Sequence, residues 1–300
     1  MNNAKALADA AAAKTAAANT GANASAISAS GASPSASARS AEVLMIGCGK
    51  MGGALLERWT GALTIPFTAV SPSGERRLPE GVAMVRAAEE LDDRRFGALI
   101  IAVKPQMVAG VLPAYLPLLA DDGVIISMAA GTSCAALRAL APEHPIIRIM
   151  PNLPVSIGRG VSGVYADGDT TPAHRGFTAT LMAPTGRVVW VDSEDQLDRV
   201  TAIAGSGPGF AFETLRAWTA AAAGLGFDEQ DARSWVLEVM RGAVELAIAR
   251  GVDLAELRNE VTSLKGTTAA GLEALNGDAA LDDRYRETLA AAYERAVELR

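Results

Sequence analysis

The amino-acid sequence predicts an α/β protein: an N-terminal parallel-sheet domain followed by an all-helical domain. Short apolar runs alternate with helical segments over residues 42–192, which is typical of a parallel sheet covered by helices on both faces. After about Gly205, apolar residues recur at helical spacing instead. The chain has 300 residues, which is long enough for two domains.

The expected strands follow one another along the first half of the chain. They are residues 43–46, 67–70, 98–103, 123–128 and 145–150, with further strand-like residues at 160–165 and 188–191. Helical segments lie between them, including residues 107–119 and 134–140. This alternation predicts strands that run parallel and are joined by helical crossovers.

The second half of the chain is expected to be helical. One apolar stripe has spacings of four and three and consists of Ala211, Leu215, Trp218, Ala222 and Leu225. Another helix begins at Asp228 and ends before Gly251, and a last one covers about residues 282–299. A few helices cannot easily bury such broad apolar faces alone, so we expect a homodimer or higher homo-oligomer.

Residues 1–41 differ in composition from the rest of the chain. Seventeen of the first 40 residues are Ala and seven are Ser, with few large apolar side chains among them. Such a segment cannot form a core, which predicts a disordered extension. The predicted organisation is therefore an extension over 1–41, a sheet domain over 42–192 and a helical dimerisation and substrate domain over 193–300.

Charge and hydropathy argue against several classes of partner. The chain has 27 Lys and Arg against 34 Asp and Glu, a net charge of −7, without a basic run. An acidic, evenly mixed surface argues against nucleic acid or an anionic membrane as partner. No apolar stretch is long enough for a transmembrane helix. We therefore expect a small-molecule substrate.

The few cysteines and histidines indicate neither a disulfide framework nor a metal site. Cys48 and Cys134 are the two cysteines, and this number fits a protein of the reducing cytoplasm. His144 and His174 have no Cys or carboxylate at a ligand spacing. We expect a cytoplasmic protein without a bound metal.

A glycine-rich turn is the most specific local feature. Residues 47–52 read Gly-Cys-Gly-Lys-Met-Gly, follow an apolar strand directly and open a helix. That context predicts a dinucleotide-binding domain of the Rossmann type, with the cofactor pyrophosphate at the helix N-terminus. The expected cofactor-binding residues here are Gly47, Gly49, Lys50, Met51 and Gly52.

The end of the second strand favours NADPH over NADH. NAD-binding domains usually have an Asp or Glu there, which holds the ribose 2′-hydroxyl. In this chain Ser71 stands at that point, and Arg76 and Arg77 follow shortly after it. We expect Ser71 and Arg76 to bind the 2′-phosphate of NADPH, with NADH as the alternative cofactor.

Four further stretches together resemble the pyrroline-5-carboxylate reductase family over residues 42–300. They are residues 103–106 (VKPQ), 148–152 (RIMPN), 204–208 (AGSGP) and 261–268 (VTSLKGTT). The resemblance implies hydride transfer from NAD(P)H to L-1-pyrroline-5-carboxylate, which gives L-proline, the last step of proline biosynthesis.

The resemblance also implies roles for single residues. The nicotinamide end of the cofactor would be lined by Val103, Lys104, Pro105, Ala129 and Asn152. The substrate carboxylate would be received by Ser263, Gly266, Thr267 and Thr268. Thr268 is implied as the catalytic residue, because its hydroxyl corresponds to the one beside the ring nitrogen. A helix that begins at Thr267 would supply free N–H donors for the carboxylate.

One stretch departs from the family's pattern. The family usually has Ser-Pro-Gly-Gly-Thr-Thr, whereas this chain has Leu264 and Lys265 between Ser263 and Gly266. The change removes a proline that favours a turn and a residue without a Cβ. Two alternatives therefore stay open: a reductase of another cyclic imine or of a small oxo or hydroxy acid, and a non-catalytic NAD(P)-binding sensor.

Overall fold

A computed structural model describes residues 42–74 and 77–300; the predicted extension, residues 1–41, lies outside the described residues. Within these ranges, eight strands form one sheet in the order β3-β2-β1-β4-β5-β6-β7-β8. Only β6 and β7 pair antiparallel. The strands are β1 Val43–Ile46, β2 Phe67–Val70, β3 Ala83–Val85, β4 Phe96–Ile101, β5 Leu119–Ser127, β6 Ile146–Met150, β7 Gly160–Ala166 and β8 Gly186–Val191.

Both faces of the central strands are buried, as the continuous apolar runs predicted. In β1, Val43 and Met45 belong to one apolar cluster, while Leu44 and Ile46 belong to the other. Successive side chains of a strand point to opposite faces, so a strand without polar positions needs cover on both sides. The crossovers include α2 (Lys50–Thr60), α4 (Cys134–Leu140) and α5 (Pro172–Met182). These observations confirm the predicted α/β class.

The predicted helix over residues 107–119 is wrong in its extent. That stretch forms η2 (Pro105–Met107), α3 (Val108–Val111), η3 (Leu112–Ala114) and η4 (Leu116–Leu118), after which β5 begins at Leu119. Pro113 and Pro117 each lack the backbone N–H that a continuing α-helix needs, and their rings clash with the preceding turn. The chain forms short 3-10 turns there instead of a continuous α-helix.

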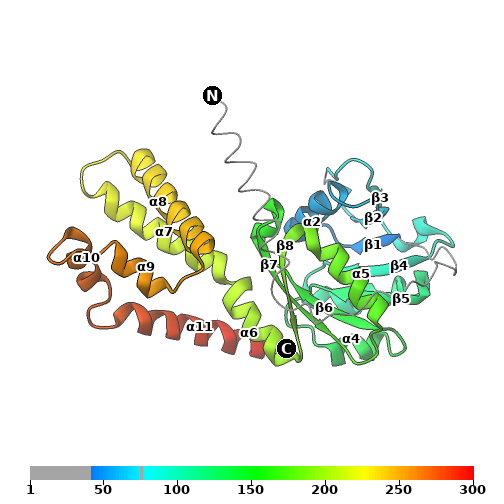
Figure 1. Cartoon of the computed structure of the whole chain (residues 1–300). Coiled ribbons are helices and arrows are strands. Elements are labelled where there is room, and N and C mark those ends of the chain that lie inside the picture. The colour runs from blue at the N-terminus through cyan, green and yellow to red at the C-terminus, as the bar shows by residue number, and fades with distance from the viewer. Residues whose placement is uncertain (1–41, 75–76) are drawn as a thin grey trace, which may run out of the picture. The chain divides into compact units, whose positions relative to one another are not determined.

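The described chain after β8 is helical, as expected (Figure 1). It comprises α6 (Glu194–Val200), the π-helical turn η7 (Thr201–Gly205), α7 (Gly207–Ala223), α8 (Glu229–Arg250), α9 (Leu254–Glu260), α10 (Thr267–Asn276) and α11 (Ala280–Glu298). None of the residues in α7, α10 or α11 is buried. Helices α7 and α8 leave large apolar side chains in solvent, such as Trp218 of α7 and Trp235 and Ile248 of α8.

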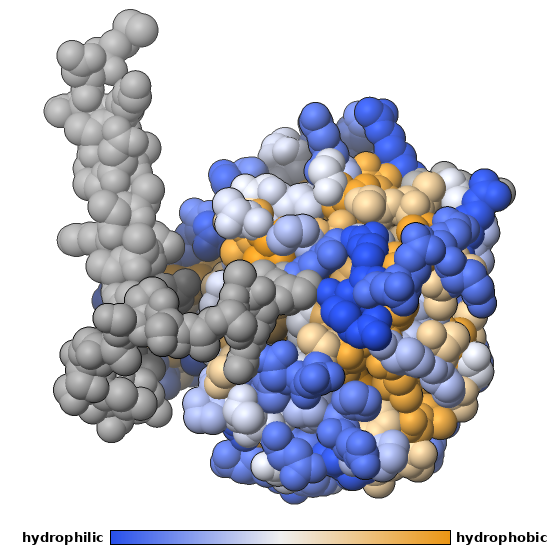
Figure 2. Space-filling model, turned by 90° about the vertical axis from the view of Figure 1, so that its right-hand side faces the viewer, coloured by the Kyte–Doolittle hydropathy of each residue, from blue (hydrophilic) through white to orange (hydrophobic). Residues whose placement is uncertain are grey.

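The side of the molecule turned toward the viewer in Figure 2 is mixed in character. Hydrophilic residues cover much of this face, and hydrophobic residues show between them. Scattered apolar surface of this kind is ordinary for a folded protein. The exposed aromatic and aliphatic side chains of α7 and α8 are more unusual, because entire helical faces remain uncovered.

Candidate active site

Two glycines of the turn after β1 allow close packing. Gly47 has a φ of +94°, and a Cβ there would lie 2.7 Å from Cγ1 of Val103. A Cβ on Gly52 would lie 2.9 Å from Sδ of Met45. A larger residue at either position would push the strand, the turn and α2 apart, so both glycines keep the turn tight.

Gly49 has a different environment. Nothing lies within 4 Å of the position that a Cβ would take. Gly49 is also the N-cap of α2, and no side chain caps this helix start. Free backbone N–H groups therefore face an open space, where an anion can approach the backbone closely. This cradle fits the pyrophosphate of a dinucleotide, with Lys50 exposed beside it and Met51 partly packed on the core.

The ends of β4 and β5 reach the same edge of the sheet. In the parallel register, Ile46 pairs with Ile101, and Ile101 with Ser127. The residues after each strand are thus neighbours across the sheet, and Val103 packs on the glycine turn. Ala129, which is 3% exposed, follows β5 at this edge. In doubly wound sheets, ligands bind at the carboxyl ends of the strands.

The ends of β2 and β3 form a second part of this edge. The backbone N–H of Ser71 donates to the Val85 carbonyl (2.9 Å). The backbone N–H of Gly74 donates to the Ser71 carbonyl (3.0 Å), which closes a turn. The guanidinium of Arg86 lies over this turn, 3.3 Å from the Cβ position of Gly74. The sequence did not single out Arg86, and Arg76, which it did, lies outside the described residues.

Asn152 is engaged in structural contacts. Its Nδ2 donates to the Ala204 carbonyl (2.8 Å), and its Oδ1 accepts from the Val161 N–H (3.0 Å). The side chain, only 6% exposed, thereby joins β7 to η7 at the start of the helical part. Its contact with a cofactor stays a prediction.

The predicted substrate loop lies at the start of α10. Gly266 is the N-cap, with no side-chain cap, and its N–H donates to the Ser263 carbonyl (3.0 Å). A Cβ on Gly266 would overlap the Ser263 hydroxyl, which would have to turn away to make room for it. Lys265 has a φ of +60°, so the loop keeps a left-handed residue without glycine at that position. Thr267 and Thr268 are exposed.

The glycine turn and this loop are not neighbours within one chain. Figure 1 shows α10 far from α2, at the other end of the helical region. The two predicted parts of the site therefore do not meet within one chain.

The described residues contain three lysines, and each lies in a predicted ligand-binding segment. They are Lys50, Lys104 and Lys265, whereas every other strong cation of the described chain is an arginine. All three are exposed, and within the described ranges none forms an ion pair. An unpaired ammonium suits an anionic ligand, and the restriction of lysine to these segments is visible in the sequence of the described residues.

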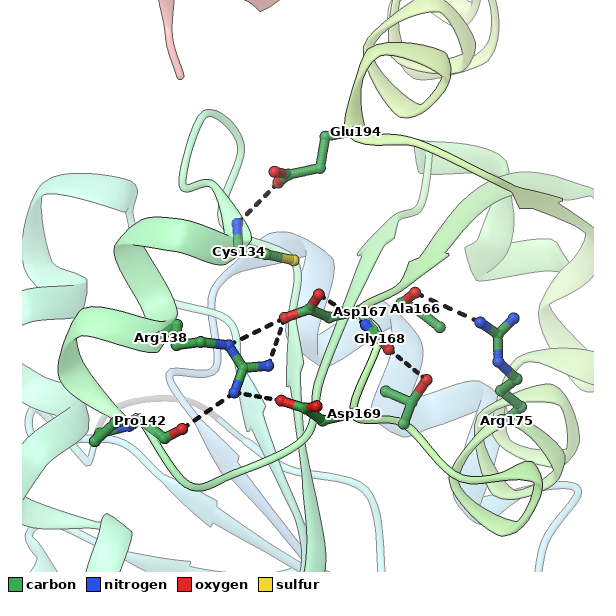
Figure 3. A network of polar contacts seen from close by, with 10 residues as sticks. Cys134, Arg138, Pro142, Ala166, Asp167, Gly168, Asp169, Arg175 and Glu194 are labelled. Carbon is green, nitrogen blue, oxygen red and sulfur yellow. Dashed lines mark hydrogen bonds and ion pairs between the residues drawn. The ribbon is translucent and has the colours of Figure 1, made fainter.

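A polar network fixes α4, which begins soon after Ala129 (Figure 3). Glu194 accepts the Cys134 N–H (2.8 Å) and pairs with the buried Arg148 (2.5 Å). Arg138 of α4 pairs with Asp167 (2.5 Å). Burial, and then the charge of Glu194, raise the pKa of the Cys134 thiol to about 12. The first residue of the helical part thus anchors a crossover helix of the sheet.

Comparisons with known proteins agree with this architecture. Residues 194–299 match the family model described as pyrroline-5-carboxylate reductase dimerisation. The chain is 34% identical to the pyrroline-5-carboxylate reductase of Pseudomonas aeruginosa over 265 residues, which cover 86% of this chain and 96% of that protein. It is also 34% identical to the Vibrio alginolyticus enzyme over 270 residues, 86% of this chain and 97% of the other.

Solved structures give the same result. The Coxiella burnetii pyrroline-5-carboxylate reductase shares 26% identity with a TM-score of 0.76, over 86% of this chain and 97% of that one. The Plasmodium falciparum pyrroline carboxylate reductase, solved with NADP bound, has a TM-score of 0.77 at 23% identity, over 86% of this chain and 97% of that one. At this level of identity, the similarity to the Plasmodium falciparum structure supports the fold of the chain.

Two searches of the described residues bear on other classes of function. No described helix has the length and apolar character needed to cross a membrane. Within residues 42–74 and 77–300, no group of three or more His, Cys, Asp or Glu side chains could hold a metal ion. The extent of the match to the Pseudomonas and Vibrio enzymes decides the family: this chain belongs to the pyrroline-5-carboxylate reductases.

Proposed function

We propose that this protein reduces L-1-pyrroline-5-carboxylate to L-proline with NADPH as hydride donor. The observation that carries the proposal is the 34% identity with the Pseudomonas aeruginosa enzyme over 86% of the chain. The open cradle at Gly49, next to an uncapped helix start, supports the dinucleotide part independently. The uncapped start of α10 supports the binding of a carboxylate substrate.

The cofactor, when bound, supplies the hydride. Gly47, Gly49 and Gly52 shape the pyrophosphate cradle, and the start of α2 contributes N–H donors and the positive end of its dipole. Val103 and Ala129, at the ends of β4 and β5, form the walls beside the nicotinamide. The chain's contribution is to hold the ring in a fixed orientation and to exclude other approaches.

The substrate carboxylate binds at the N-terminus of α10, where Gly266, Thr267 and Thr268 present backbone N–H groups. Lys265 adds a positive charge at the edge of that site. The Thr268 hydroxyl orients the ring nitrogen and stabilises the amine that forms. The imine enters already protonated from water, so no strong general acid is required. Catalysis is then mainly positioning.

A second copy of the chain completes the site. The loop before α10 is remote from the glycine turn within one chain (Figure 1), while α7, α10 and α11 have no buried residues. Association through these helices would bury their apolar side chains and could bring the loop of one copy to the sheet edge of the other. The family model that matches residues 194–299, named for dimerisation, supports this arrangement.

We also propose that residues 42–192 are the nucleotide-binding domain and residues 193–300 the dimerisation and substrate domain. Support comes from the end of β8 at Val191 and the start of α6 at Glu194. A cytoplasmic location is proposed because the sequence has two cysteines, Cys48 and Cys134, a number that indicates no disulfide framework and fits the reducing cytoplasm.

Steady-state NADPH oxidation with pyrroline-5-carboxylate tests the function. Thr268→Ala should lower kcat/KM about 10- to 100-fold, because one hydrogen bond to a charged group is lost. The KM for NADPH should stay within about twofold, since the residue contacts only substrate. Thr180→Ala, which removes an exposed hydroxyl of α5, is the matched control and should behave as wild type. NADPH binding without turnover would favour the sensor or another imine substrate.

A further inference from the structure

We propose that Arg86 selects NADPH over NADH by binding the 2′-phosphate of the adenosine ribose. The inference rests on the proposed function, because the phosphate belongs to the cofactor assigned there. It identifies a specificity-determining residue at a position that the sequence pattern does not mark. Three observations support it: the place of Arg86 at the sheet edge, its contact with Gly74 and its lack of a partner.

The register of β2 and β3 places Arg86 at the edge where the adenosine ribose binds. Val70 pairs with Val85 at the ends of these parallel strands, and the Ser71 N–H donates to the Val85 carbonyl (2.9 Å). Arg86 follows Val85 and therefore lies beside the turn that begins at Ser71. In dinucleotide-binding sheets, the end of the second strand is the place where the ribose hydroxyls are recognised.

The turn after β2 accommodates the guanidinium because it contains a glycine. Gly74 has a φ of +64°, and its Cβ position would lie 3.3 Å from Nε and 3.4 Å from Nη2 of Arg86. A side chain at residue 74 would meet the guanidinium at less than ordinary contact distance. The glycine at residue 74 thus lets the guanidinium of Arg86 approach the turn closely.

Arg86 has no partner among the described residues that would neutralise it. It is exposed, and across residues 42–74 and 77–300 it forms neither a hydrogen bond nor an ion pair. Arg138 and Arg148, by contrast, are held by carboxylates. A guanidinium with free N–H groups can bind phosphate oxygens in bidentate fashion.

The residues around Arg86 suit a phosphate better than a pair of ribose hydroxyls. Residues 71–74, which follow β2, contain no carboxylate that could accept hydrogen bonds from the ribose or repel a phosphate; the next acidic residue in the sequence, Glu75, lies outside the described residues. The hydroxyls of Ser71 and Ser73 could donate to the same phosphate. Both features favour the phosphorylated cofactor.

Calorimetric titration of the full-length protein with two adenosine probes tests the inference without turnover. The probes are adenosine 2′,5′-bisphosphate and adenosine 5′-monophosphate, which differ only in the 2′-phosphate. Wild type should prefer the bisphosphate. Arg86→Gln should weaken bisphosphate binding about 10- to 100-fold and monophosphate binding less than about twofold. Arg86→Lys should lose part of the preference, because the charge remains without the fork.

Two control variants test whether the preference for the bisphosphate depends on Arg86 in particular or on any nearby or exposed arginine. Arg77→Gln changes the next described arginine of the same connection, and Arg187→Gln changes an exposed arginine of β8; both should keep the preference. Unchanged preference in Arg86→Gln, or its loss in Arg77→Gln instead, overturns the assignment and leaves the proposed function intact. A wild type that binds neither probe overturns the dinucleotide site itself, and with it the proposed function.

Discussion

Two glycines of the turn after β1, Gly49 and Gly52, allow the effects of alanine substitution on folding and on cofactor binding to be measured separately. Gly49 and Gly52 lie three residues apart, yet a Cβ meets open space at Gly49 and Sδ of Met45 at Gly52. The carbonyl oxygen of Gly47 lies 3.1 Å from the same Cβ position on Gly52. Gly49→Ala should therefore impair binding without unfolding, whereas Gly52→Ala should destabilise the fold.

For Gly49→Ala, the stability terms nearly cancel. Its φ of −68° suits alanine, and the loss of a flexible residue stabilises the fold by about 0.4–1 kcal/mol. Alanine is a poorer N-cap than glycine by a similar amount. We therefore expect the Tm to change by less than about 2 °C. The methyl group would hold the pyrophosphate away from the backbone, and the loss of one charge-assisted hydrogen bond raises Kd for NADPH about 10-fold or more.

For Gly52→Ala, alanine gains about 1 kcal/mol of helix propensity in α2. Overpacking against Met45 and the Gly47 carbonyl costs about 1–3 kcal/mol. A net loss of about 1 kcal/mol should lower the Tm by roughly 2–4 °C.

Thermal unfolding of the apoprotein and fluorescence titration with NADPH measure the two effects separately. The reasoning is refuted if Gly49→Ala binds NADPH as tightly as wild type, because the backbone would then not approach the pyrophosphate. A Gly49→Ala protein with a Tm lowered by several degrees would equally contradict the open space observed at that residue.

Three further predictions concern other positions. Lys265→Gly should raise the unfolding free energy by about 1 kcal/mol in urea titrations, because glycine adopts the φ of +60° without strain. Native Cys134, with a pKa of about 12 from burial and then Glu194, should resist iodoacetamide at pH 8 and react only after unfolding. Burial raises the pKa of Asp167, but hydrogen bonding and charge from Arg138 lower it below its usual value. The resulting stability is lost as pH falls from about 4, so Asp167→Asn should show a smaller loss in acid unfolding curves.

Local signals in the sequence determined the class of the protein and its nucleotide turn. The apolar runs predicted the strands because a strand buried on both faces has no polar positions. The glycine pattern predicted the turn because three glycines within six residues meet three local needs of such a turn: a tight bend, close approach of the backbone to a pyrophosphate, and close packing of the helix on the strand. Local sequence also explains why residues 107–119 do not form one helix, because Pro113 and Pro117 interrupt it. The helical spacing of the apolar residues in this stretch nevertheless led to the prediction of a continuous helix.

Only the tertiary structure showed which distant residues meet. Strand β3 has three residues with two of them exposed, so its pattern is too short to be recognised, and its pairing alone places Arg86 beside Gly74. Glu194 caps the start of α4 from 60 residues away. The separation of the α10 loop from the glycine turn likewise depends on the path of the whole helical region. Sequence patterns report what each segment buries, whereas strand order and packing decide which segments become neighbours.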